Sequence, residues 1–313
     1  MKLSPRCLFK YVPGVLSAFA LLFACHLPAQ HMDIEGQTGG FITPSAYVLY
    51  TQEGSLFSHP AVSYHLVSAS KVIGNVHTVS LTEGIANRAE IGYTRSIHTT
   101  GDSPLFSALW HYNGMNIFSG KVVTLQERGK WIPTISAGGA IRTSDRFVSG
   151  ALNKELYGTT KSYTNGEVYL VASKMRLKPP VPIMLNFGWK VTNASISGLG
   201  GQATRFGGRF FGGVGFPLPG PWHTAIVPGV GITQEPPQVK NLGAILVGGK
   251  AHLPSTLDYA IRVTQKTAPH FSFDIGIGQV AGQIGTTYVA GSGFVPVNLQ
   301  ARHILGLGLS IRY

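Results

Sequence analysis

The sequence predicts an all-β fold class, a transmembrane barrel of antiparallel strands, and three observations support it. Of the 313 residues, 40 are Gly and only 12% are charged, whereas an average soluble domain has about 7% Gly and about 25% charged residues. After the first thirty residues, no apolar run approaches the ~20 residues that a membrane-spanning helix needs. Several segments instead alternate apolar residues with small or charged ones, the pattern of strands with one face in lipid and one in water.

The N-terminus has the plan of a secretory signal peptide, in which three basic residues precede an apolar stretch at 12–27. We expect residues 1–29 to be removed by cleavage after Ala29. Alternatively, residues 22–25 resemble a bacterial lipobox, which would make Cys25 the lipidated first residue. Signal removal leaves 22 basic and 13 acidic residues, a net charge of +9. No disulfide and no cysteine metal ligand is expected in the mature chain.

Residues 30–54 are too rich in Gly and Pro for a spanning strand. We expect either a periplasmic extension or a plug-like segment folded into the barrel mouth. The Gly-rich stretch 36–40, which runs into Ile-Thr-Pro-Ser-Ala at 42–46 and then Glu53-Gly54, resembles the start of the YjbH-like group of bacterial outer-membrane proteins. This resemblance implies a role linked to exopolysaccharide production or export.

Residues 55–313 are predicted to form the barrel, with about fourteen strands and twelve as the alternative. The expected strands are 55–67, 75–82, 88–97, 116–126, 132–142, 167–176, 182–192, 206–217, 223–233, 244–253, 256–265, 271–280, 285–296 and 302–313. Alternation is clearest in four of them, at 183–191, 257–264, 271–278 and 305–313. The weakest is 285–296. Fourteen strands are preferred because they make every periplasmic connection short and leave the longer ones extracellular, as in single-chain outer-membrane barrels.

The predicted connections divide into two groups. Short periplasmic turns are expected at 83–87, 127–130, 177–181, 218–222, 254–255 and 281–284, and longer extracellular loops at 98–115, 143–166, 193–205 and 234–243. Trp131, Trp222 and Tyr313 then fall at one rim, as an aromatic girdle requires. Leu309, Ile311 and Tyr313 give the last strand an apolar face and an aromatic end, which we interpret as an assembly signal. The expected partners are therefore outer-membrane lipid and the barrel-assembly machinery.

The search for catalytic chemistry finds no metalloprotease, nucleophile-elbow, phosphate-loop or Cys-x-x-Cys motif. We predict no enzyme activity, cofactor, metal or nucleic-acid partner. Ser63 and His65 leave open an outer-membrane lipid hydrolase. His65 and His77 lie on neighbouring predicted strands and are the closest approach to a metal pair, although solvated histidines are the commoner explanation.

Strand parity predicts a net basic lumen. The inward-facing cations are Lys174, Lys190, Arg209, Lys250, Arg262 and Arg312, set against Glu90, Asp258 and Asp274. A lumen lined by positive charge within low-dielectric walls concentrates anions. Small anions or an anionic polysaccharide are therefore the predicted solutes. The alternative is that these cations only pair with lumenal carboxylates or with lipid phosphates at the rim.

A five-residue connection at 266–270, closed about its centre, places Arg262 opposite Asp274 across two strands. Side chains opposed on one sheet face lie ~4.5–5.5 Å apart at Cβ, so we predict an ion pair in a wet lumen.

Together these observations predict a non-enzymatic channel, or an accessory to envelope polysaccharide, in the bacterial outer membrane. The alternatives are an outer-membrane lipid hydrolase and a secreted or periplasmic all-β binding protein.

Overall fold

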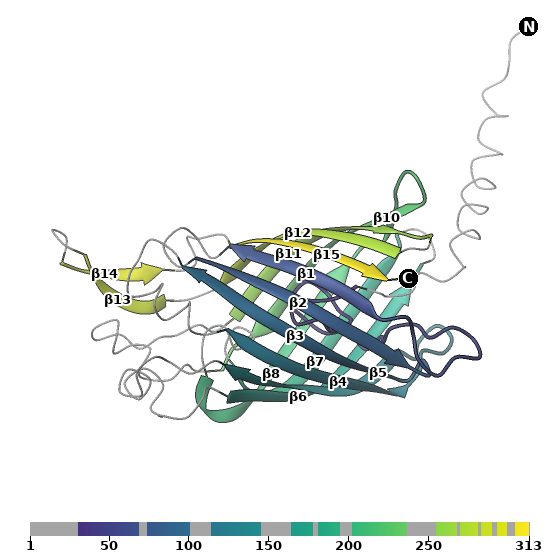
Figure 1. The fold of residues 1–313 in the computed structure, drawn as a ribbon, viewed down its shortest axis with the longest axis horizontal. Helices are drawn as coiled ribbons and strands as arrows, with labels where there is room; N and C mark the ends of the chain where they lie inside the picture. The colour runs from purple at the N-terminus through teal and green to yellow at the C-terminus, as the bar shows by residue number, and fades with distance from the viewer. Residues whose placement is uncertain are drawn as a thin grey trace, which may run out of the picture.

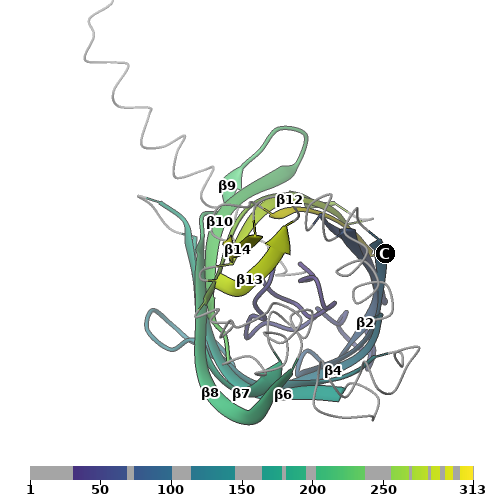
Figure 2. The same ribbon diagram turned by 90° about the vertical axis from the view of Figure 1, so that its left-hand side faces the viewer.

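The computed structural model shows a closed antiparallel β-barrel (Figures 1 and 2). It describes residues 31–68, 74–100, 114–144, 164–177, 181–194, 202–236, 255–267, 270–280, 283–289, 293–298 and 304–312. Twelve strands form the wall, in the order β11-β12-β15-β1-β2-β3-β4-β5-β6-β7-β8-β10, and pairing of β10 with β11 closes the ring. No helix within the described ranges has the length and hydropathy to cross a membrane.

The wall strands are β1 (Ala61–Ser68), β2 (Gly74–Ile85), β3 (Ala89–Thr100), β4 (Met115–Leu125), β5 (Thr134–Ser144), β6 (Thr164–Arg176), β7 (Ile183–Ala194), β8 (Gln202–Gly215), β10 (Thr224–Gln234), β11 (Ser255–Gln265), β12 (His270–Val280) and β15 (Ile304–Arg312). A two-residue strand, β9 (Leu218–Pro219), pairs with β10 beside the wall. A separate hairpin consists of β13 (Gln283–Val289) and β14 (Gly293–Asn298).

The strand number is therefore twelve, the stated alternative, and the preferred fourteen is wrong. Residues 285–296 form most of the β13–β14 hairpin outside the wall. Gly291, Gly293 and Pro296 interrupt that stretch, and such residues favour a turn and an edge over a spanning strand. Because β10 pairs directly with β11, no strand stands between them in the wall, while the segment 244–253 itself lies outside the described residues.

Losing two predicted strands also reverses the predicted directions of β11 and β12. The short periplasmic turns expected at 254–255 and 281–284 are therefore wrong, because Ser255 begins β11 and Val280 ends β12 at the end opposite the short turns. The link between β11 and β12 now lies at the end that carries the short turns, such as the one between β2 and β3. The connection from β12 to β15, which contains the hairpin, lies at the opposite end (Figure 1). Short turns face the periplasm in outer-membrane barrels, so we name this end the periplasmic rim.

The outer surface of the wall is apolar because alternate residues of every strand point outward. On β2, Val79 and Leu81 are 47% and 52% exposed, whereas Ser80 and Thr82 between them are each 1% exposed. Ile261 on β11 and Leu309 on β15 continue the apolar surface around the ring. A soluble protein rarely shows so large an apolar surface, whereas a lipid bilayer requires one. The fold is therefore that of a transmembrane barrel and not of a soluble sandwich.

The lumen holds residues 31–51, here called the plug, which Figure 2 shows inside the ring of strands. Of the 21 plug residues, 15 are buried. Bridges Met32–Thr38 and Gly39–Pro44 fold the plug on itself. The plug therefore contacts inner-wall side chains that the sequence analysis expected to face water, as the plug-like alternative for residues 30–54 allows.

Both ends of the plug lie at the periplasmic rim. The His31 ring lies 3.3 Å from the Thr264 hydroxyl, one residue before the end of β11. At the other end, Thr51 bonds to Asn87 in the tight turn between β2 and β3, where the backbone N–H of Thr51 donates to Asn87 Oδ1 at 2.6 Å. Asn87 has a φ of 53°, a value that Asn tolerates better than most residues. The plug is therefore a loop that enters and leaves the barrel at one end.

Candidate functional site in the plugged lumen

The first contact centre of the plug joins Glu90 on β3 to Lys121 on β4. Their Oε1 and Nζ atoms are 2.9 Å apart, and both side chains are at most 2% exposed. The Lys121 ammonium also donates to the backbone carbonyls of Thr38 at 3.0 Å and Ser45 at 2.8 Å. The Glu90 carboxylate accepts from the N–H of Thr38 and from that of Leu49. One wall ion pair thus holds three points of the plug.

The second centre is built around Arg142 on β5, whose side chain is fully buried. Its Nε and Nη2 atoms donate to the two carboxylate oxygens of Glu35 in the plug, at 2.6 and 2.5 Å. Nη2 also lies 3.1 Å from the carboxylate of Glu167 on β6, which Lys190 on β7 reaches at 3.4 Å. The pair of Arg142 and Glu35 is therefore bidentate and charge-assisted, and such hydrogen bonds are stronger than those between neutral groups.

The third centre contains the predicted pair. Arg262 stands opposite Asp274 in the β11–β12 register, and its Nε and Nη2 atoms donate to the Asp274 carboxylate. The register and the ion pair were therefore predicted correctly. The setting differs, because both side chains are nearly buried and Arg262 also donates to the plug carbonyls of Gly39 and Met32, at 3.0 and 3.4 Å.

Three other predicted lumenal cations also have acceptors. Lys174 lies near the periplasmic rim, 2.9 Å from Glu127. Arg209 donates to the Glu235 carbonyl at 3.0 Å, and Arg312 to the plug carbonyl of Tyr50 at 3.3 Å. Lys250 lies outside the described residues.

The predicted assembly signal and lipidation site are only partly visible. Leu309 is 52% exposed on the outer face, and Ile311 is partly exposed on the same strand. Tyr313 and Cys25 lie outside the described residues, so their roles stay predictions.

Sequence reasoning missed Glu35, Lys121, Arg142 and Glu167. Lys121, Arg142 and Glu167 occupy inward positions of predicted strands and could have been found by the parity count. Glu35 lies in the Gly-rich segment, where no periodic pattern marks a direction.

Ser63 and His65 lie on the inner face of β1, and each is 1% exposed. The His65 ring packs edge-on against Phe41 of the plug, with centroids 6.1 Å apart. His77 points to the outer face, where the Tyr64 hydroxyl lies 2.7 Å from Nδ1 of its ring. The suggested approach of His65 to His77 is therefore wrong, because the two residues are one register step apart and face opposite sides. Within the described ranges, no group of three or more potential metal ligands is found.

One plug carboxylate has an incomplete set of partners. Asp33 is 1% exposed, and its Oδ1 accepts the N–H groups of Glu35 and Gln37, both at 2.9 Å. Its Oδ2 has no hydrogen-bond partner among the described residues. Burial, followed by the nearby Glu35 charge, raises the pKa of Asp33 well above its ordinary value.

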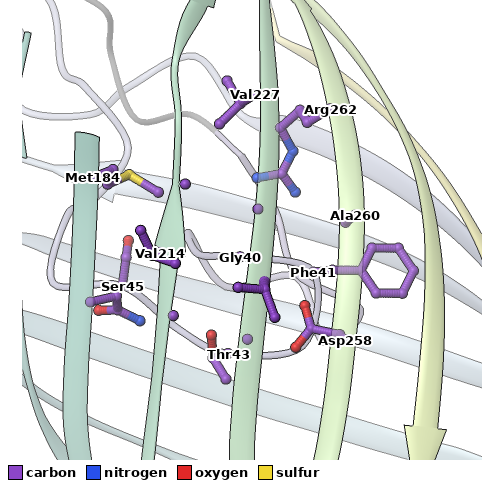
Figure 3. Close-up of a pocket in the computed structure, with 16 residues that line it drawn as sticks. Gly40, Phe41, Thr43, Ser45, Met184, Val214, Val227, Asp258, Ala260 and Arg262 are labelled. Carbon is purple, nitrogen blue, oxygen red and sulfur yellow. The ribbon is translucent and has the colours of Figure 1, made fainter. Parts of the chain in front are cut away.

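A cavity of about 60 Å³ separates the plug from one side of the wall (Figure 3). Its wall side is formed by β7, β8, β10 and β11, and its plug side by Gly40, Phe41, Thr43 and Ser45. Figure 3 shows Asp258 and Arg262 at different ends of this space, with Thr43 near Asp258.

The barrel, its apolar outer face and the plug define a transmembrane β-barrel of the outer-membrane type with an occupied lumen. No protein-family model matches the chain, and no curated protein matches its sequence, so the YjbH-like resemblance stays a prediction. Among solved structures, the fold is similar to the NanC porin, with 9% identity, a TM-score of 0.47, and 80% of this chain and 98% of the porin covered. For LpxR from Salmonella typhimurium the identity is 7%, the TM-score 0.45, and the coverage 81% and 100%. For an outer-membrane channel from Pseudomonas putida F1 these values are 10%, 0.42, 84% and 98%.

Proposed function

We propose that the protein is an outer-membrane channel that its own plug holds closed, and that it admits anionic solutes when the plug withdraws. The observation that carries this proposal is the set of acceptors that the plug offers to the wall. Four cations of the inner wall donate to oxygen atoms of the plug: Lys121, Arg142, Arg262 and Arg312. The plug thus occupies donors that an anionic solute would use.

Withdrawal of the plug changes the balance of charge in the lumen. Arg142 loses the Glu35 carboxylate, which leaves the channel together with the plug. Lys121 and Arg262 keep their wall carboxylates but lose two carbonyl acceptors each. Donors freed in this way attract oxyanions within a narrow, low-dielectric passage. Small anions and the carboxylates of an acidic polysaccharide share this chemistry.

A non-enzymatic role is part of the proposal. The Ser63 and His65 side chains face the plug and are each 1% exposed, whereas membrane lipid lies on the other side of the wall. A lipid ester has no route to that pair in the closed barrel.

Planar-bilayer recording of the purified protein tests the proposal. The full-length chain should conduct little, and a variant lacking residues 31–51 should show a larger, stable conductance with a reversal potential in a KCl gradient that favours chloride. Arg142→Ala provides a second variant with an intact chain and should open intermittently. Lys174→Met is the matched control, because its ion pair lies near the rim and is partly exposed, and it should behave as the wild type.

Two results would contradict the proposal. One is an unchanged conductance from a plug-deleted barrel that still shows heat-modifiable mobility, and the other is a reversal potential that favours potassium. Block of the open variant by oligogalacturonate but not by maltooligosaccharide would identify an acidic polysaccharide as cargo. Block by neither leaves small anions as the passengers.

A further inference from the structure

We infer that the cavity beside the plug is a binding site for a small monovalent cation and that Asp258 is its anionic ligand. This site is independent of the channel role, since it exists in the closed barrel with the plug in place.

The cavity exists because the wall lacks side chains where it faces the plug. Gly213 pairs with Gly231, and Gly215 with Gly229, across the β8–β10 register. All four glycines line the cavity. These glycines therefore leave a space between this side of the wall and the plug.

Asp258 contributes a carboxylate to the lining of the cavity. Its side chain is 5% exposed and lines the space. Its neighbour across the β10–β11 register is Gly231, which has no side chain that could cover the carboxylate. Within the described residues, no hydrogen bond and no ion pair within 4 Å reaches this carboxylate, whereas Glu90 and Asp274 both have such partners.

Arg262, the nearest cation on the same strand face, does not fill this role. Its Nε and Nη2 atoms are bound to Asp274, and Nη1 donates to the Gly39 carbonyl at 3.0 Å. Figure 3 places its guanidinium away from the Asp258 carboxylate. Arg262 therefore acts on Asp258 through space and not through a hydrogen bond, and the Asp258 oxygen atoms stay available as ligands.

Size and ligand number narrow the class of cation. A space of about 60 Å³ exceeds the ~10–15 Å³ that one water molecule requires, so it has room for a potassium or sodium ion or a primary ammonium group. Calcium requires six to eight oxygen ligands, but Asp258 supplies the one carboxylate among the lining residues. A buried unpaired carboxylate is costly, so a cation that neutralises it stabilises the folded barrel.

Thermal unfolding of the detergent-solubilised, full-length protein tests this site without any need for conduction. The midpoint is compared at equal ionic strength in potassium chloride, methylammonium chloride and choline chloride, since choline is the bulkiest of the three cations and its quaternary ammonium has no N–H donor. Binding to the folded state alone should raise the midpoint by about 3 °C at ten times Kd. A rise with potassium identifies an inorganic ion, and a rise with methylammonium identifies an ammonium group.

Asp258→Asn should abolish the difference from choline. Gly231→Ala provides a second test that keeps the carboxylate, because a Cβ at Gly231 would overlap with the Asp258 side chain and displace it. Gly276→Ala on β12 is the matched control, since its Cβ would meet the Tyr259 carbonyl at 3.1 Å and Gly276 does not line the cavity. Equal midpoints in all three salts for the wild type, or an undiminished shift in both Asp258→Asn and Gly231→Ala, would overturn the inference.

Discussion

Arg142 and Glu35 are 107 residues apart in sequence, yet the Arg142 guanidinium donates hydrogen bonds to both carboxylate oxygens of Glu35, at 2.6 and 2.5 Å. The pair attaches the plug to β5. Removing one partner of a buried pair leaves an uncompensated charge, which costs about 3–5 kcal/mol. We therefore expect Arg142→Ala to weaken plug docking by about that amount, measured as faster hydrogen exchange of residues 31–51.

The Lys174–Glu127 pair serves as the comparison, because both side chains are at least 20% exposed. Exposed pairs contribute about 0–1 kcal/mol, so Lys174→Met should leave exchange in the plug almost unchanged. Equal effects from Arg142→Ala and Lys174→Met would show that Arg142 does not anchor the plug.

Gly306 and Phe41 show complementary sizes at the contact between β15 and the plug. A Cβ built at Gly306 would overlap with the Phe41 ring. We expect Gly306→Ala to destabilise the docked plug by about 1–3 kcal/mol through overpacking. Adding Phe41→Leu should recover part of that loss in the thermal midpoint. A double variant that is worse than the sum of both single changes would refute the steric explanation.

We expect plug docking to depend on pH through Asp33. Its raised pKa means that the docked state favours the protonated acid, so this stabilisation is complete below the ordinary pKa and is lost as pH rises through the raised value. Asn keeps an oxygen for the N–H groups of Glu35 and Gln37 and cannot ionise. Asp33→Asn should therefore flatten the decline of plug protection with rising pH, as followed by hydrogen exchange. A wild-type slope in the variant would exclude Asp33 as the group responsible.

Ile261 tests the orientation of the wall. It is 48% exposed on the outer face, at the middle of β11. Arginine at the midplane of a bilayer costs a barrel about 2–4 kcal/mol, and only about 0–1 kcal/mol near the interface. Ile261→Arg should lower the free energy of unfolding in lipid vesicles by the larger amount. Ile311→Arg, close to the periplasmic rim, should stay within the smaller one, and a reversed order would mean that the depth assignment is wrong.

The strands and their faces were predictable because alternation with period two is a local property of the chain. The Arg262–Asp274 register followed from the length of one connection. The strand number failed for a physical reason: removing the strand predicted at 285–296 together with the one predicted at 244–253 preserves parity. The rule that periplasmic turns are short holds for twelve strands as well as for fourteen, so it could not separate them.

The candidate site was predictable only where it lies on strands. Arg142 and Lys121 follow the inward parity of their segments, but their plug partners are set by contacts between distant parts of the chain. The bond from the Tyr169 hydroxyl to Gln37 spans 132 residues, and that from Arg262 to Gly39 spans 223. No local pattern encodes such contacts. The basic composition of the lumen therefore suggested open water where the chain supplies its own acceptors.

The position of both plug ends at one rim determines how the barrel can exchange its contents. His31 lies beside Thr264, and Tyr50 beside Arg312, so the intervening chain forms a hairpin and does not pass from one mouth to the other. A hairpin can slide out and return without threading a free end through the ring or breaking any rung between wall strands. The proposed withdrawal of the plug would therefore cost only contacts inside the lumen, and the pairing of β1 with β15 would stay intact.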